Sequence, residues 1–186
     1  MYDSVTAKDI PAHATMVAGY IDGKFRWSQA DWARFPHATK VRIAVSPHTD
    51  DGHVLDVEPG DSTPAQAQAW IRTRHAAGLS RPTIYCNRST WPAVRAACKG
   101  LTYAVWIAEW TGHQHGIEGA AACQWATPGH GSPGHYDISL VTDDRWPREV
   151  EESASSCSAP GSKLTIDVAG PSNDSEARKG FGAQGF

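Results

Sequence analysis

The stretch His53-Val54-Leu55-Asp56-Val57-Glu58-Pro59-Gly60 places two carboxylates at the end of a short apolar run. Successive side chains of a strand alternate between its faces, so this pattern predicts Asp56 and Glu58 on one shared face. Like charges packed on a buried face cost free energy and raise the pKa of at least one carboxyl group. We therefore interpret the pair as a candidate catalytic centre. From this motif alone, a metal site or a solvated strand end remains an alternative.

Eight short apolar runs, separated by turn residues, predict eight strands. They cover residues 1–5, 16–21, 40–45, 53–58, 82–87, 103–109, 122–126 and 135–141. Thr63 as cap, Pro64 at the first helical position and Gly78 as terminator predict a helix between the fourth and fifth strands. Two further helices are expected over 28–35 and 90–99. Alternation of strand, helix and strand implies parallel pairing with right-handed crossovers.

Strands with helices in only some of the gaps predict an α/β fold, an irregular β/α barrel of TIM type whose later half has lost most of its helices. An open α/β sheet is the alternative. In such barrels the functional residues lie at the carboxyl ends of the strands, which is the position of Asp56 and Glu58. Asp3 in the first strand and Asp137 in the last would join them, because these strands are neighbours in a closed barrel. We thus expect a cluster of four acids, although Asp3 at a frayed terminus and Asp137 as a strand-start cap are alternatives.

The chain has 186 residues, a formal net charge of −3 and charged residues at 20% of its positions. This balance provides no electrostatic footprint for nucleic acid or an anionic membrane. No apolar run approaches the roughly 18 residues of a membrane span, and no amino-terminal basic and apolar segment indicates an export signal. We therefore expect synthesis in the cytoplasm without a signal peptide, and neither nucleic acid nor a membrane span.

Composition changes near Pro147, beyond which Ser, Gly, Glu and Lys dominate. This change predicts one domain over 1–146 and a mobile Ser/Gly-rich tail or linker over 147–186, in which residues 163–168 could add a strand.

Cysteines and histidines do not form a metal motif. The four cysteines, at positions 86, 98, 123 and 157, lack C-x-x-C spacing, and we expect free thiols. The nine histidines include His113, His115, His130 and His135, which lie in Gly-rich segments without helical i, i+4 spacing. We expect neither a metal nor a cofactor.

Several segments share their order and spacing with one known enzyme family. They are Tyr2-Asp3-Ser4, Val54-Leu55-Asp56-Val57-Glu58, Thr83-Ile84-Tyr85-Cys86, Val105-Trp106-Ile107-Ala108, and Gln124-Trp125 followed by Tyr136-Asp137-Ile138. Over residues 2–146 the chain resembles glycoside hydrolase family 25, the lysozymes that cut the bacterial cell wall between N-acetylmuramic acid and N-acetylglucosamine. Through Ala18-Gly19-Tyr20-Ile21-Asp22-Gly23 and Glu58-Pro59-Gly60-Asp61 it is most similar to the family-25-like domains of actinobacteria and their phages.

This resemblance implies an irregular β/α barrel with an acidic groove and assigns roles to the four acids. Glu58 would be the general acid that protonates the glycosidic oxygen, and Asp56 would assist at the reacting sugar. Asp3 and Asp137 would shape the groove and orient the substrate. Whether cleavage inverts the sugar or uses its own acetamido group is left open.

Substrate-binding candidates lie near the strand ends, where flat aromatic faces could stack on sugar rings. They are Tyr20, Tyr85 and Trp125. Glu109 is added because it stands where the resemblance predicts an aromatic residue, on the floor of the groove. Trp106, in mid-strand among apolar neighbours, is expected in the core.

Taken with the resemblance, these residues predict a peptidoglycan hydrolase, an N-acetylmuramidase of phage endolysin type. It would act at the bacterial cell wall, outside the cell or on a virion, after release through a holin or as a virion component. The main alternative is a carbohydrate-binding or structural tail protein that keeps the barrel but has little turnover. Hydrolysis of another N-acetylated polysaccharide is a third possibility.

Overall fold

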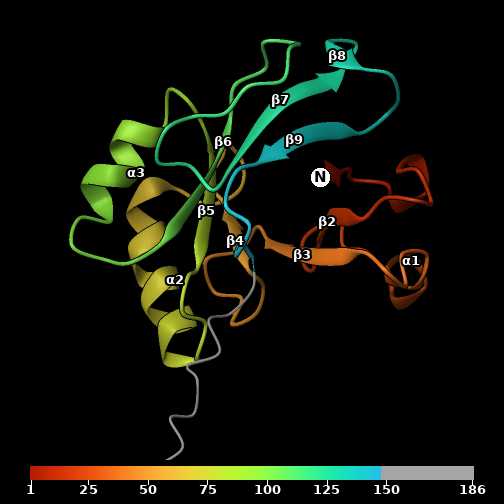
Figure 1. Ribbon diagram of the computed structural model, residues 1–186. Helices are drawn as coiled ribbons and strands as arrows, with labels where there is room; N and C mark the ends of the chain where they lie inside the picture. Colours follow the sequence, from red (N-terminus) through yellow and green to blue (C-terminus); the bar gives the residue numbers. More distant parts are fainter. Residues whose placement is uncertain (148–186) are drawn as a thin grey trace, which may run out of the picture. The chain divides into compact units, whose positions relative to one another are not determined.

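The computed structural model describes residues 1–147, which form a closed barrel of eight strands (Figure 1). The strands are β1 (Tyr2–Asp3), β2 (Met16–Tyr20), β3 (Thr39–Ala44), β4 (Val54–Asp56), β5 (Thr83–Asn87), β6 (Ala104–Ala108), β7 (Ala122–Pro128) and β9 (Asp137–Val141). From β1 to β7 each strand is parallel to its predecessor. The ring closes through β9, which is antiparallel to both β7 and β1.

All eight predicted strands are present, and the barrel is closed, so the open sheet is excluded. The antiparallel β9 departs from the expected parallel pairing. Its cause is the short link from β7, residues 129–136, whereas a parallel return needs a crossover of a dozen or more residues. The two-residue strand β8 (Gly131–Ser132) in this link pairs with the end of β7 and was not predicted, because it has no apolar pattern.

The three predicted helices are present as α1 (Gln29–Ala33), α2 (Pro64–Ala76) and α3 (Trp91–Ala97), and a 3-10 turn covers Ala7–Asp9. The capping box of α2 forms, because the side chain of Gln66 accepts a hydrogen bond of 2.9 Å from the backbone N–H of Thr63. Within residues 1–147, the links that follow β6 and β7 contain no helix. The helices therefore cover only part of the barrel's outside.

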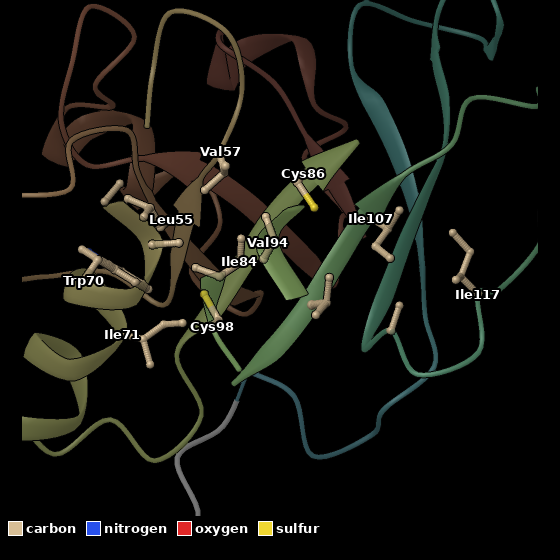
Figure 2. Close-up of a cluster of buried hydrophobic side chains, with 14 of the residues drawn as sticks. Leu55, Val57, Trp70, Ile71, Ile84, Cys86, Val94, Cys98, Ile107 and Ile117 are labelled. Atoms are coloured by element: carbon tan, nitrogen blue, oxygen red, sulfur yellow. The ribbon is translucent and has the colours of Figure 1, made fainter. Parts of the chain in front are cut away.

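Two apolar layers meet at the strands because side chains alternate between the faces. Inward residues such as Val54 and Trp106 fill the barrel. Outward residues, including Leu55, Ile84 and Ile107, belong to an outer cluster that also contains Trp70 of α2 (Figure 2). Since Val54 points in and Leu55 points out, Asp56 and then Glu58 return to the inner face, as the sequence predicts.

The remaining sequence expectations divide at the end of the described region. Cys86, Cys98 and Cys123 are free and buried. Cys157, the tail beyond residue 147 and the strand expected over 163–168 lie outside the described residues. Among the helices of residues 1–147, none has the length and apolarity to cross a membrane.

Candidate active site

Asp56 and Glu58 line one pocket of about 430 Å³ at the carboxyl ends of the parallel strands. Its other walls are residues that follow β2, β3 and β4, together with the last residue of β2: Tyr20, Asp22, Gly23, Lys24, Phe25, Val45, Pro59, Gly60 and Asp61. Gly60 permits the turn beneath Glu58, because its φ of 101° lies in the left-handed region. The loops thus open a polar hollow above the barrel interior, where functional sites of such barrels lie.

Burial and neighbouring negative charges raise the pKa of both carboxyl groups in this pair. Asp56 is 3% exposed, and burial, followed by the charges of Glu58 and Asp61, raises its pKa to about 8. The pKa of Glu58 is raised by burial and by the charges of Asp61 and Asp137. At neutral pH Asp56 is therefore predominantly protonated, and the pair holds at least one proton ready for transfer.

Asp3 and Asp137 face one another across the barrel's closing seam, because they are direct partners in the β1–β9 register. Asp3 is 4% exposed, and burial together with the charge of Asp137 raises its pKa well above the ordinary value. The charge of Asp3 in turn raises the pKa of Asp56, and that of Asp137 raises the pKa of Glu58. The structure therefore brings the four predicted acids to one end of the barrel interior.

Gln124 of β7 connects this cluster by hydrogen bonds to two aromatic residues, and the sequence did not indicate a role for it. Its amide nitrogen donates to Asp3 Oδ2 at 2.9 Å and to Asp137 Oδ2 at 3.4 Å. Its oxygen accepts from the Tyr85 hydroxyl and from Trp110 Nε1, each at 2.8 Å. The available signal was a polar side chain within an otherwise apolar strand, since such a residue on the inner face needs buried partners.

The two candidate tyrosines have different surroundings. Tyr20 lines the pocket, and its ring centroid lies 6.2 Å from that of Phe25, an exposed neighbour that the sequence did not single out. Tyr85 is buried, its ring packs edge-on against Trp106 at 4.8 Å, and its hydroxyl is bonded to Gln124. Tyr20 can therefore contact a ligand, whereas Tyr85 supports the acids from within.

Trp125 does not join the site, contrary to our expectation. Gln124 takes the inward position of β7, so the adjacent Trp125 points to the outer face, where it packs against the outer apolar layer. It borders a separate surface hollow with Tyr2 and Met16. Trp106 is in the core as predicted, with its indole nitrogen donating to Ser139 Oγ at 3.0 Å.

Glu109 also lies apart from the pocket. Its carboxylate meets His115 Nε2 at 2.9 Å and the Arg88 guanidinium at 3.9 Å. It follows the inward Ala108 and so points away from the barrel interior. Glu109 thus holds the loop that carries His115 and is not part of the groove floor.

Within residues 1–147, no group of three His, Cys, Asp or Glu side chains is arranged to hold a metal ion. The fold and the site define a closed mixed β-barrel with a carboxylate-lined pocket at one mouth. Neither a scan against protein-family models nor a search of curated proteins found a match for this chain. Its function has to be argued from the geometry.

Proposed function

We propose that this protein is a glycoside hydrolase that cleaves the β-1,4 bond between N-acetylmuramic acid and N-acetylglucosamine in peptidoglycan. The observation that carries the proposal is the pair Asp56 and Glu58, which share one pocket and have raised pKa values. Cleaving an acetal near pH 7 needs a carboxyl group that is still protonated, beside negative charge that stabilises an oxocarbenium-like transition state. The raised pKa values of Asp56 and Glu58 support the first of these requirements.

Glu58 is the general acid in this proposal, because it is less buried than Asp56 and lines the open pocket. Its carboxyl proton passes to the glycosidic oxygen as the bond from that oxygen to the anomeric carbon breaks. A water molecule then adds to the anomeric carbon and returns a proton to Glu58. Asp56, protonated beneath it, does not repel the new carboxylate and can donate a hydrogen bond toward the reacting sugar.

Asp3 and Asp137 complete the proposed site from the opposite side of the barrel. Their charges act on Asp56 and Glu58, which supports the role of the acidic pair in tuning proton affinity and orienting the substrate. Tyr20 and Phe25 offer aromatic surface within the pocket for a sugar ring.

We further propose that the fold is a reduced β/α barrel of the family-25 type. Seven consecutive parallel strands, three outer helices between them and a site at the strands' carboxyl ends support this assignment. With peptidoglycan as its partner, the protein would act at the bacterial cell wall, reached through a holin or on a virion.

Digestion of purified peptidoglycan by the wild type and by Glu58→Gln tests the function directly. We expect the wild type to clear a wall suspension and to release fragments with N-acetylmuramic acid at the reducing end, identified by mass spectrometry. Glu58→Gln should bind the walls without clearing them. Wall binding without clearing by the wild type would instead identify a carbohydrate-binding protein, and N-acetylglucosamine at the reducing end would change the bond assigned.

A further inference from the structure

Trp110 presents an apolar surface beside the acid cluster. It follows β6 by two residues, so it continues the inward face of Trp106 and Ala108 to the mouth of the barrel. Trp110 is 49% exposed, and the large apolar side chains exposed in the described part of the chain are Val5, Phe25 and Trp110. About half of the Trp110 side chain is therefore accessible to a ligand at the mouth of the barrel.

The polar edge of the Trp110 indole is hydrogen-bonded to Gln124. Its Nε1 donates to Gln124 Oε1 at 2.8 Å, and Gln124 is 1% exposed. Because the same amide donates to Asp3 Oδ2 at 2.9 Å, the indole nitrogen of Trp110 is linked through Gln124 to the acids of the site. The polar edge is thus satisfied by the protein, and the apolar faces are left for another contact.

The loop that carries Trp110 is held by backbone bonds to β7. The N–H of Glu109 donates to the Gln124 carbonyl at 2.9 Å, and that of Gly112 donates to the Trp125 carbonyl at 3.0 Å. Gly112 has a φ of 75°, and a side chain at Gly131 would start 2.7 Å from the Gly112 Cα, so this loop and β8 fit closely together at one end of the barrel (Figure 1). Because these contacts hold the loop in place, Trp110 loses little conformational entropy when a ligand binds.

Aromatic surface therefore borders the acids on two sides. Around the ring, Tyr20 ends β2, Glu58 follows β4 and Trp110 follows β6, so the acid lies between the two aromatic positions. A polysaccharide that crosses the mouth would place one sugar on each side of its cleaved bond. Tyr20 and Phe25 already line the pocket on the first side, and Trp110 is the exposed aromatic residue on the second.

We propose that Trp110 is a sugar-stacking residue that binds the C–H face of an N-acetylhexosamine ring on the β6 side of Glu58, with Gln124 as the positioning residue that fixes its indole. The choice of ligand rests on the proposed function. A single ring within a polar, carboxylate-rich mouth matches a pyranose, whose hydroxyl groups need acceptors and whose C–H face needs one flat apolar surface. A protein partner would call for a contiguous apolar patch.

The test measures binding of N,N′,N″-triacetylchitotriose to full-length protein carrying Glu58→Gln, so that no turnover occurs. Indole N–H signals are followed in ¹⁵N-labelled protein, and loss of one peak in Trp110→Phe assigns Trp110. We expect that peak to move on titration. Trp110→Ala should weaken binding about tenfold or more, and Trp110→Phe, which keeps a flat ring, about threefold or less.

Two variants of Gln124 separate positioning from general damage. Gln124→Glu in its protonated form keeps an oxygen that accepts from Trp110, and should bind the sugar nearly as well as its parent. Gln124→Leu removes the acceptor and should shift the Trp110 indole signal and weaken binding severalfold, although Trp110 itself is unchanged. Equal affinities for the two variants would refute the positioning role.

Trp32→Ala is the matched control, since this tryptophan lies on α1 and packs against Trp27 outside the mouth. It should leave affinity unchanged. Sugar binding that leaves the Trp110 signal in place and survives Trp110→Ala, or an absence of binding, overturns the inference. Failure of the proposed function is distinct: the sugar would move the Trp110 signal while the wild type clears no peptidoglycan.

Discussion

The two pairs of acids at the mouth of this barrel have similar chemistry, but only one of the pairs lines the pocket. Asp56 and Glu58 open into a pocket of about 430 Å³. Asp3 and Asp137 lie at the closing seam of the barrel, where Gln124 donates to both. The first pair can reach a ligand, whereas the second reaches it mainly through its electric field.

In the proposed mechanism, this contrast would assign proton transfer to one pair and the tuning of proton affinity to the other. A carboxyl group that donates a proton has to touch the leaving oxygen, which requires open space. A carboxyl group that raises a neighbour's pKa has only to lie close to it in a medium of low dielectric constant, which burial provides. Asp3 and Asp137 fit the second role, because their charges raise the pKa values of Asp56 and Glu58, respectively.

The largest effect is expected for Glu58→Gln. An amide of the same shape cannot donate a proton to a glycosidic oxygen, so the rate of wall hydrolysis should fall about 1,000-fold. Thermal stability should be unchanged or higher, because the pKa of Glu58 is raised in the fold and ionisation there is unfavourable. Turbidity assays and thermal unfolding measure the two effects.

Asp144→Asn is the control for this variant, since Asp144 is an exposed acid in the turn after β9 and should be silent in both assays. Near-normal activity of Glu58→Gln would show that Glu58 does not donate the proton. It would also contradict the assignment of proton transfer to the pair that lines the pocket.

Asp3→Asn should have a smaller effect on rate, about 10- to 100-fold. An asparagine oxygen can still accept from Gln124, so the fold should survive, but the proton-holding partner of Asp137 is lost. The loss should fall on kcat, with the change in KM below about threefold, because Asp3 is buried and does not line the pocket. A change in KM alone would indicate that Asp3 contacts the substrate directly, which would contradict the contrast between the two pairs of acids.

The open pair follows from the sequence, while the buried network does not. Strand alternation alone places Asp56 and Glu58 on one face, and closure of the barrel brings Asp3 and Asp137 together. Gln124 and Trp125 are adjacent, and the sequence cannot say which points inward, because a slip of one residue exchanges the faces. The register of β7 against β9, with its irregularity after Gln124, makes that choice.

The role of Trp110 could not be predicted for the same reason. Its position depends on a hydrogen bond to Gln124, a residue that is 14 positions away in the chain and lies on the neighbouring strand. Glu109 illustrates the converse. Its acidic side chain suggested a groove residue, but alternation after Ala108 directs it to His115 and Arg88.

Asp56→Asn tests how much burial destabilises the open pair. The pKa of Asp56 is raised from 3.8 to about 8, so the folded protein holds a proton that the unfolded chain releases. Stability of the wild type should therefore fall as the pH rises from about 4 to 8, and the substitution should remove that part of the decline. We expect Asp56→Asn to be more stable at pH 8 by about 5 kcal/mol and nearly neutral at pH 4. Urea unfolding at both pH values checks this, and equal stability of the two proteins at pH 8 would contradict the burial argument.

The smallest effect is expected for Asp61→Asn. This substitution changes the electric field at Glu58 but leaves the four acids of the two pairs unsubstituted. Asp61 is the charge with the largest effect on the pKa of Glu58, and both residues line the pocket. Removing that charge lowers the pKa of Glu58, so Glu58 loses its proton at a lower pH. The alkaline limb of the activity profile should then move to lower pH, while the maximal rate changes less than about twofold. Profiles of wild type and Asp61→Asn, measured at low and at high salt, make this quantitative, because screening should shrink the difference. The charge of Asp61 raises the pKa of Asp56 as well as that of Glu58, so a limb that stays in place would mean that neither of these carboxyl groups loses its proton there, which would contradict Glu58 as the general acid.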